Sequence, residues 1–341
     1  MKSYENIFIS SLTTMRIGGT ARHVFEIESE RDIPESYAFA SAYWYPTYII
    51  GGGANTIGRD EGLDGVILLN RLRGFSDKDG EFTVMAGENW DNIVDYACQK
   101  GYTGIEALSK IPGLVGAAPV QNIGAYGQEV ANVFESARVY DTATNSFITL
   151  EKKDFQFGYR KSIMNSTMKG RFFIVSVTLK LSKGQMSRPF YASMEKYIED
   201  YGATDFSPMG VREIVSAIRK EKLPDPREKA SAGSFFKNVY LDPIQTEQAE
   251  EKGWKVHRTT EGGKINSAWL IEECGFKGQL LYGMRVNPAA PLVLINESAG
   301  TYANLARARA LITSTVYDKF GYWLEQEPVE IINTKNRGAQ V

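Results

Sequence analysis

Apolar residues recur with a helical period in three separate stretches of the chain. In "NWDNIVDYACQKG" the period begins after Asn89, which is suited to an N-cap, and stops at Gly101. The period in "VREIVSAIRKEKLPDP" ends at Pro224, and that in "TYANLARARALITSTVYDKFG" closes at Gly321. The predicted apolar faces are Ile93, Val94, Ala97 and Cys98; Val211, Ile214, Val215 and Ile218; and Leu305, Leu311, Ile312, Val316 and Phe320.

Other stretches are typical of strands. Tyr48 to Ile50 reads as a short buried strand that runs into a glycine-rich loop. A passage rich in β-branched and aromatic residues follows the middle of the chain, in "SARVYDT", "SFITLEKK" and "RFFIVSVTLKLS". The segment "YWLEQEPVEII" near the end alternates as a strand, so the chain mixes helices and strands along its length.

The size and charge of the chain narrow its class. At 341 residues it exceeds the usual size of one hydrophobic core, which predicts two or three domains. A net charge of -2, with dispersed Lys and Arg, disfavours nucleic-acid binding, which needs a basic face. We therefore expect a small or nucleotide-sized partner.

The residue types present limit both location and chemistry. No stretch of about 18 apolar residues occurs, and the N-terminus lacks a signal pattern, so we expect a cytoplasmic protein without a membrane segment. Cys98 and Cys274 lack metal or disulfide spacing, and His23 and His257 are too few for a histidine metal site. We expect no metal, and proton transfer by Ser, Tyr, Glu or Lys.

Two glycine-rich segments suggest ligand loops. In "IIGGGANT" the backbone N–H groups of the glycines could cradle a phosphate, although a simple tight turn explains this stretch equally well. In "PVQNIGAYGQE" two glycines flank Tyr126 in a stretch without helical or strand period. Glycine permits conformations closed to other residues and lets the backbone approach a bound group, which is typical of a loop around a ligand.

Several motifs together resemble one family. They occur in the order "TTMRIGG", "IIGGGANT", "AGENW", "GIEALSKIPGLVGAAPVQNIGAYGQE", "FGYRKS", "KLPDP", "AGSFFKN", "WLIEECGFKG" and "LVLINE". In this order they closely resemble the UDP-N-acetylenolpyruvoylglucosamine reductases, the MurB flavoenzymes of peptidoglycan precursor synthesis. The resemblance runs from about Thr13 to the final strand, and the long central block and "AGSFFKN" are highly specific.

The resemblance implies an α+β architecture. The family has an FAD-binding fold of the vanillyl-alcohol-oxidase type, built from two subdomains, and a C-terminal α/β substrate domain. On this sequence we expect the first FAD-binding subdomain over 1–72, joined by the C-terminal strand 321–341. The second FAD-binding subdomain would span 73–222, and the substrate domain 223–320.

The resemblance also implies the residues around a non-covalent FAD. The glycine-rich loop would hold its diphosphate, a second loop would contact it, and the "QNIGAYG" stretch would lie beside the flavin. The expected residues are Gly51, Gly52, Gly53, Ala54 and Asn55; Pro112, Gly113 and Gly116; and Gln121, Asn122, Gly124, Ala125, Tyr126 and Gly127.

Three residues match the catalytic positions of the family. The family reaction moves a hydride from NADPH through FAD to the enolpyruvyl group of a UDP-sugar. Arg160 matches the arginine that stabilises the resulting enediolate, and Ser234 matches the proton donor. Glu327 is the ungapped match to the third position, although proline and glutamate are exchanged relative to the usual pattern. Alternation puts Glu325 on the same face, as a second candidate, and Glu330 on the opposite one.

Three further residues match substrate positions. Lys222 and Asn238 correspond to contacts of the substrate diphosphate, and Tyr191 to a tyrosine on a closing loop in one subclass of the family. A packing role for Tyr191 stays open. Arg219 and Lys220 end the same helix as Lys222, where interaction with the helix dipole accounts for their charge.

Two other interpretations stay open. One is another FAD oxidoreductase of the same fold, which would leave "AGSFFKN" and "FGYRKS" without a role. The other is a non-catalytic UDP-sugar-binding relative, which would be expected to lack Arg160, Ser234 or the glutamate. We expect a monomer that uses NADPH and a UDP-sugar. Ser231, three residues before Ser234, is interpreted as an exposed turn serine.

Overall fold

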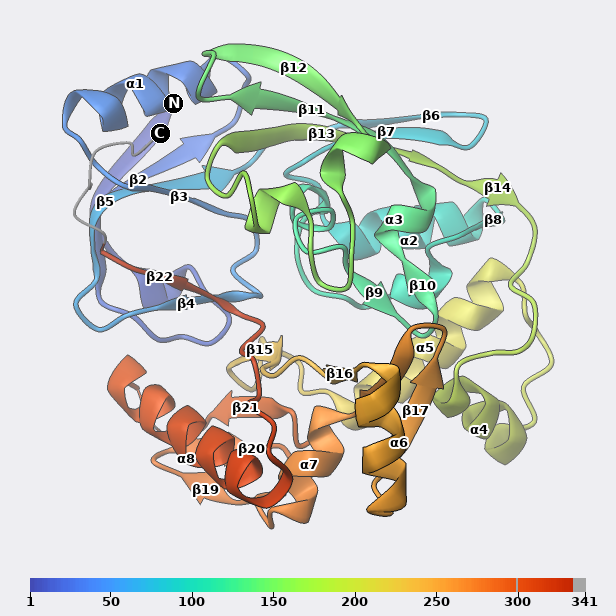
Figure 1. Ribbon diagram of the computed structural model, residues 1–341. Helices are drawn as coiled ribbons and strands as arrows, with labels where there is room; N and C mark the ends of the chain where they lie inside the picture. The colour runs from blue at the N-terminus through green and yellow to red at the C-terminus, as the bar shows by residue number, and fades with distance from the viewer. Residues whose placement is uncertain (299, 334–341) are drawn as a thin grey trace.

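The computed structural model describes residues 1–298 and 300–333, which form an upper and a lower region in the view of Figure 1. The N-terminal segment builds a sheet in the order β1-β2-β5-β3, with β1 antiparallel to β2 and the other pairs parallel. Its elements are β1 (Lys2–Phe8), β2 (Thr20–Ile27), α1 (Asp32–Ala42), β3 (Thr47–Ile50) and β5 (Leu63–Asn70). The run Val66 to Leu69 is buried on both faces, as expected of a strand with parallel neighbours.

A second sheet has five antiparallel strands in the order β12-β11-β13-β7-β6. The strands predicted in the middle of the chain are confirmed as β11, β12 and β13. The bounds are β6 (Phe75–Lys78), β7 (Glu81–Met85), β11 (Phe134–Asp141), β12 (Ser146–Glu151) and β13 (Phe172–Lys180).

Several short elements lie between or after these strands along the chain. They are β8 (Tyr102–Thr103), β9 (Gly124–Ala125), β10 (Gln128–Glu129), α3 (Val130–Val133) and β14 (Ser182–Lys183). Five 3-10 turns occupy Ile9–Ser11, Glu106–Leu108, Val115–Ala117, Lys152–Phe155 and Ile163–Asn165.

Helix α2 lies beside this second sheet, α5 packs against α2, and α4 lies next to α5 and farther from the sheet (Figure 1). The first predicted helix is α2 (Trp90–Gln99), and the side chain of Asn89 accepts a hydrogen bond from the Asn92 N–H at 3.1 Å, which confirms the N-cap. The second is α5 (Pro208–Lys222), whose predicted apolar face is buried. Helix α4 (Ala192–Tyr201) precedes α5 and packs against it.

The lower region contains two small sheets covered by three helices (Figure 1). The sheet order β15-β21-β20-β19 uses β15 (Ser231–Ser234), β19 (Leu280–Leu281), β20 (Met284–Val286) and β21 (Val293–Asn296). The order β16-β18-β17 uses β16 (Val239–Leu241), β17 (Val256–Thr259) and β18 (Gly262–Ile265). The helices are α6 (Pro243–Glu251), α7 (Ser267–Glu273) and α8 (Tyr302–Phe320).

Helix α8 corrects one predicted core residue. Gly321 ends the helix with a φ of 81°, as expected. Leu311, expected in the core, is exposed, whereas Ala308 is fully buried. Ala308 lies four residues before the buried Ile312, on the same face, whereas the neighbouring Leu311 is rotated by about 100° from Ile312.

The end of the chain returns from the lower region to the upper one (Figure 1). Tyr322 and Leu324 still pack with α8 in the lower core, and β22 (Val329–Ile331) then pairs in parallel with β4 (Thr56–Gly58). The predicted C-terminal strand is therefore shorter than its alternating pattern. Residues 334–341 of the segment expected to join the first FAD-binding subdomain lie outside the described residues.

The loop after β3 requires glycine at position 53. Gly53 has a φ of 65°, and a Cβ built there would lie 2.0 Å from the Leu12 carbonyl oxygen. We expect Gly53→Ala to lower the free energy of unfolding by about 2 kcal/mol or more, because left-handed strain adds to this overlap. Denaturant unfolding without added cofactor measures it. The control is Gly52→Ala, whose Cβ would meet Gly113 Cα at an ordinary 3.4 Å; equal losses would contradict this account.

Candidate active site

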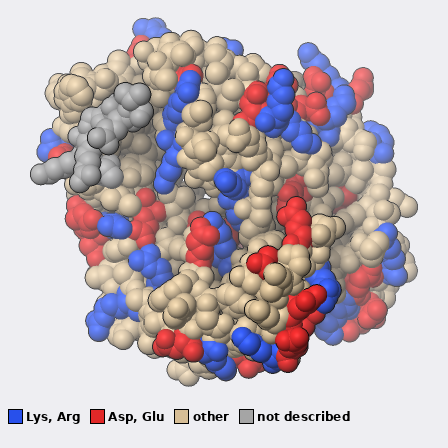
Figure 2. Space-filling model, viewed as in Figure 1, with Lys and Arg blue, Asp and Glu red and all other residues tan. Residues whose placement is uncertain are grey.

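A cleft of about 1290 Å³ lies between the upper and lower regions of the protein. Ligand pockets for one drug-sized molecule are roughly 300 to 1,000 Å³, so this cleft is larger than such a pocket. The face shown in Figure 2 is hollowed near its centre, and acidic and basic side chains alternate around that hollow. The lining residues come from widely separated segments of the sequence.

Two glycine loops face each other across one end of the cleft. Gly52 approaches Gly113 closely enough that a Cβ on Gly52 would touch the Gly113 backbone. Gly51 to Asn55 and Pro112, Gly113 and Gly116 all line the cleft, as the family resemblance implied. Beneath the first loop, the buried Thr13 hydroxyl has no hydrogen-bond partner among the described residues.

The second glycine loop is held by the first turn of α2. The Trp90 N–H donates to the Gly113 carbonyl at 3.1 Å, and its indole N–H donates to the Leu108 carbonyl at 3.0 Å. The Val115 N–H donates to the Glu88 carbonyl at 2.9 Å. These bonds fix the loop backbone on both sides of the glycine.

The "QNIGAYG" stretch divides into residues that face the cleft and residues that hold the loop. Gln121, Gly124, Ala125 and Tyr126 line the cleft, but Asn122 and Gly127 are not among the described residues that do so. Asn122 is instead buried beneath the loop. Its amide donates to Glu129 at 2.8 Å and to the Gly158 carbonyl at 3.1 Å, and it accepts from the Ala131 N–H at 3.0 Å. Gly127, with a φ of 87°, makes the turn between β9 and β10.

Arg160 and Glu327 form an ion pair in the cleft wall. Arg160 Nε lies 3.1 Å from Glu327 Oε1, and the two side chains are only 19% and 11% exposed. The guanidinium also donates to the Gly124 carbonyl at 2.8 Å. A Cβ on Gly124 would lie 3.0 Å from Glu129 Cγ and 3.2 Å from the Arg160 guanidinium, so a larger residue would crowd both side chains.

Glu327 rather than Glu325 faces the cleft. Burial raises the pKa of Glu327, although the charges of Arg160 and Lys237 oppose that rise. Glu325 is 72% exposed and pairs with Lys237 at 2.6 Å instead. The two glutamates thus differ in exposure although they lie two residues apart in an extended segment.

A chain of hydrogen bonds joins Glu327 to the first glycine loop. Asn55 Nδ2 donates to Gln121 Oε1 at 2.7 Å, and Gln121 Nε2 donates to Glu327 Oε1 at 3.4 Å. Gln121 therefore uses both ends of its amide to connect a loop residue to the buried carboxylate. A shift of Glu327 would be transmitted to Asn55.

Ser234 ends strand β15 and lines the same cleft. The segment that contains Glu327 pairs with the residues just after Ser234, because the Glu327 N–H donates to the Phe235 carbonyl at 2.9 Å. Phe235 and Phe236 are fully buried and anchor this stretch. The interpretation of Ser231 as an exposed turn serine is wrong, because Ser231 is a strand residue that is 1% exposed.

Lys222, Asn238 and Tyr191 also line the cleft. Lys222 is the last residue of α5, and Tyr191 precedes α4 with its ring 5.9 Å from that of Tyr126 in a T-shaped contact. Asn238 accepts a hydrogen bond from the Ser267 N–H at 3.1 Å, which ties it to the start of α7.

Sequence reasoning missed Arg219, which it interprets as a helix-end cation. Arg219 lines the cleft one turn before Lys222, and its Nε is buried without a hydrogen-bond partner among the described residues. Burial lowers the pKa of Arg219, and interaction with the Tyr126 hydroxyl opposes this. The i, i+3 spacing from Lys222 was the available signal, but charge alone does not reveal burial.

Curated relatives match nearly the whole chain. UDP-N-acetylenolpyruvoylglucosamine reductase from Amoebophilus asiaticus is 35% identical over 96% of this chain and 98% of its own length. The enzyme of that name from Burkholderia multivorans is 37% identical over 94% and 95%. The chain belongs to the UDP-N-acetylenolpyruvoylglucosamine reductase family.

Two family models match different parts of this chain. A model described as an FAD binding domain matches residues 21–151, and one described as the C-terminal domain of UDP-N-acetylenolpyruvoylglucosamine reductase matches residues 225–331. The crystal structure of the Thermus caldophilus reductase matches with a TM-score of 0.67 and 22% identity, covering 96% of this chain and 98% of that one. The expected fold class and FAD as cofactor are thereby confirmed.

Residues 1–298 and 300–333 contain neither a membrane-spanning helix nor a cluster of metal-ligand side chains. Within those ranges, no helix is both long and apolar enough to cross a membrane. The same residues contain no group of three or more His, Cys, Asp or Glu side chains that could hold a metal ion.

Glu327 and Glu330 should affect stability in opposite pH ranges. Burial alone would raise the pKa of Glu330, but hydrogen bonds from Arg59, Arg309 and Tyr302 outweigh it and lower the pKa. The contribution of Glu330 is therefore present above the ordinary glutamate value of 4.5 and lost as the pH falls through its lowered pKa. The contribution of Glu327, whose pKa is raised, is present below 4.5 and lost as the pH rises.

Denaturant unfolding of the wild type, Glu327→Gln and Glu330→Gln across this pH range measures the effect. The difference between wild type and Glu327→Gln should fall as the pH rises above 4.5. The difference for Glu330→Gln should fall as the pH decreases instead. The two variants serve as each other's control, and parallel trends would contradict the assigned environments.

Proposed function

We propose that this protein reduces the enolpyruvyl group of UDP-N-acetylglucosamine enolpyruvate with NADPH and FAD, giving UDP-N-acetylmuramate for peptidoglycan synthesis. The observation that carries this function is the buried Arg160–Glu327 pair, which shares one cleft with Ser234. The printed names of the relatives support the substrate class.

The residues of the cleft fit a flavin dinucleotide. The backbones of Gly52 and Gly113 face each other, Gly113 has a φ of 133° that favours glycine, and the N–H groups after Gly51 can hold a diphosphate. FAD, when bound, supplies the ability to accept a hydride from NADPH and to deliver it to a carbon–carbon double bond. We assign Gln121, Gly124, Ala125 and Tyr126 to the flavin end of the cleft.

Arg160 meets the first demand of the substrate chemistry. Hydride addition at the terminal vinyl carbon leaves negative charge at the next carbon, delocalised into the carboxylate as an enediolate. A fixed guanidinium in a site with little water stabilises such charge and can grip a carboxylate through two bonds. Glu327 and the Gly124 carbonyl hold Arg160 in one orientation for this role.

Ser234 meets the second demand, which is protonation of the adjacent carbon. A serine hydroxyl is a weak acid, but an enediolate is a strong base, so the transfer can be downhill when the hydroxyl is held above the carbon. The end of β15 fixes Ser234, because the next residue donates its N–H to the Leu292 carbonyl at 2.8 Å. Phe235 and Phe236, which follow Ser234, are fully buried in the lower core and anchor this end of the strand.

Glu327 assists through its raised pKa. A carboxyl group that is protonated more readily than an ordinary glutamate can donate a hydrogen bond to the substrate carboxylate or supply a proton. The neighbouring Arg160 would then face the substrate anion with less competition from Glu327.

We assign the substrate diphosphate to the end of the cleft formed by Lys222, Asn238 and Tyr191. Arg219 adds a second cation one turn from Lys222, and its unpaired Nε can donate to a bound anion. NADPH would use the same end of the cleft before the sugar nucleotide. A cytoplasmic monomer with domains 1–72, 73–222 and 223–320 completes the proposed description.

An anaerobic visible spectrum of the flavin-loaded protein tests this function. NADPH should bleach the flavin absorbance, and the enolpyruvyl UDP-sugar alone should restore it. Restoration by a small ketone or aldehyde in place of the sugar would favour another oxidoreductase of the same fold. Failure of NADPH to bleach the flavin would support the non-catalytic alternative.

Ser234→Ala separates the two half-reactions. We expect bleaching by NADPH to continue near the wild-type rate, while reoxidation by the sugar slows roughly a hundredfold, the scale of lost general acid catalysis. Rapid-mixing spectroscopy measures both. Ser193→Ala, which removes a hydroxyl elsewhere in the cleft, is the matched control and should affect neither step strongly. Equal slowing of both steps in Ser234→Ala would contradict its role.

A further inference from the structure

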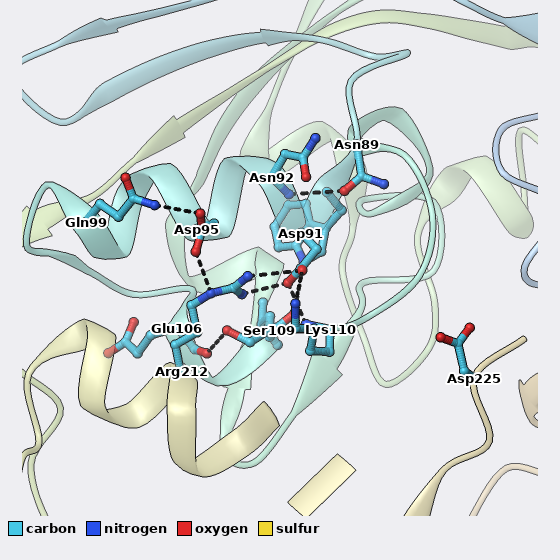
Figure 3. Close-up of polar contacts among 12 residues, drawn as sticks. Asn89, Asp91, Asn92, Asp95, Gln99, Glu106, Ser109, Lys110, Arg212 and Asp225 are labelled. Carbon is cyan, nitrogen blue, oxygen red and sulfur yellow. Dashed lines mark hydrogen bonds and ion pairs between the residues drawn. The ribbon is translucent and has the colours of Figure 1, made fainter. Parts of the chain in front are cut away.

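A buried ion pair joins α5 to α2 at some distance along α5 from the cleft residues (Figure 3). The Arg212 side chain, on α5, is 8% exposed, and its two terminal nitrogens lie 2.6 and 3.0 Å from the two carboxylate oxygens of Asp91. Its Nε donates to Asp95 at 2.9 Å. Three directed bonds from one guanidinium to two residues of α2 leave little freedom for either helix to rotate.

Asp91 also holds the second glycine loop. Its carboxylate accepts the Lys110 N–H at 2.7 Å and the Lys110 ammonium at 3.0 Å (Figure 3). Lys110 has a φ of 59° and leads directly into Ile111, Pro112 and Gly113, which line the cleft. One carboxylate therefore connects the helix α5 with the loop assigned to the cofactor.

The helical periodicity of α5 places Arg212 on the same side of the helix as Arg219, which lines the cleft. Arg219 lies seven residues, or about two turns, after Arg212, so both side chains leave the helix in nearly the same direction. Lys222 follows on the next turn, and both Arg219 and Lys222 line the cleft. A rotation of α5 about its axis would move these two cations together.

The ion pair restricts the orientation of α5 against α2 more strictly than the apolar contacts around it do. Burial would raise the pKa of Asp91, but hydrogen bonds from Arg212 and Lys110 outweigh it and lower the pKa to about 2, so the pair stays charged at neutral pH. Apolar packing of α5 through Val211 and Val215 is non-directional and tolerates small rotations. The forked bond to Asp91 tolerates only one arrangement.

We propose that Arg212 is a positioning residue for substrate binding, which fixes α5 against the Lys110–Gly113 loop so that Arg219 is presented to the anionic portion of the substrate. This inference rests on the proposed function of the cleft. It predicts that Arg212 acts through Arg219, although Arg212 is not among the described residues that line the cleft.

A double-mutant cycle in the flavin-loaded enzyme tests the inference. We expect Arg212→Met to raise the KM for the enolpyruvyl UDP-sugar about tenfold with a smaller change in kcat, because misplacement of Arg219 weakens binding. In the Arg219→Met background, the same substitution should change KM by less than about twofold. Arg212→Lys keeps the positive charge but cannot make the two parallel bonds to Asp91. Its KM should lie between those of the wild type and Arg212→Met, and its effect on KM should also disappear in the Arg219→Met background.

Arg171→Met is the matched control. Arg171 makes a similar forked pair with Asp141, at 2.8 and 2.7 Å, and the pair includes no residue of α5. Its effect on KM should be the same with Arg219 or Met at position 219. A merely structural role for Arg212 would likewise lower stability without interacting with position 219.

The outcomes distinguish this inference from the proposed function. If wild-type enzyme reduces the sugar but the effects of Arg212→Met and Arg219→Met on KM multiply, the positioning role is wrong and the function stands. If Arg212→Met does not fold, Arg212→Lys takes its place in the cycle. The positioning role is then wrong if the effects of Arg212→Lys and Arg219→Met on KM multiply in the double variant. If the wild-type flavin is not reoxidised by the sugar, the proposed function fails before the cycle is measured.

Discussion

The site depends on the ion pair between Arg160 and Glu327, whose atoms approach to 3.1 Å in a largely buried setting. A buried charge without a partner costs several kcal/mol, so each residue requires the other in the absence of ligand. Arg160 belongs to the turn after the central loops, whereas Glu327 belongs to the segment that returns from the lower region of the protein. The pair therefore brings the two regions together at the position where the reacting group would bind.

The same segment carries two glutamates with opposite electrostatic environments. Glu330 receives hydrogen bonds from Arg59, Arg309 and Tyr302, so its charge is fully compensated between β4 and α8. The Glu327 side chain is as little exposed as that of Glu330, at 11%, but burial outweighs the charges of Arg160 and Lys237 and raises its pKa. Three residues of sequence therefore separate a glutamate whose pKa is lowered by its hydrogen bonds from one whose pKa is raised by burial.

Sequence patterns were sufficient for local structure and for most residues of the cleft. Periodicity and capping located α2 and α5, because the core face and the Asn89 cap are encoded within a few residues. They did not separate Leu311 from Ala308, since apolar character does not specify which face packs. The residues that the family motifs proposed as catalytic, Arg160, Ser234 and Glu327, all line the cleft, whereas Asn122 supports the loop from beneath. Arg219 is buried by segments that lie far from it in the sequence, so the pattern of charges along α5 could not predict its burial.

The "TTMRIGG" stretch explains how the two ligand-binding regions keep a fixed separation. The Thr14 N–H donates to the Gly53 carbonyl at 3.1 Å, while its hydroxyl donates to the Ser231 carbonyl at 2.6 Å. The Ser231 N–H returns a bond to the Thr14 carbonyl at 3.1 Å. One residue thus spans from the glycine loop to the strand that ends at Ser234. Because hydride transfer requires reacting atoms about 3 to 3.5 Å apart, a short connection of this kind controls geometry better than packing alone.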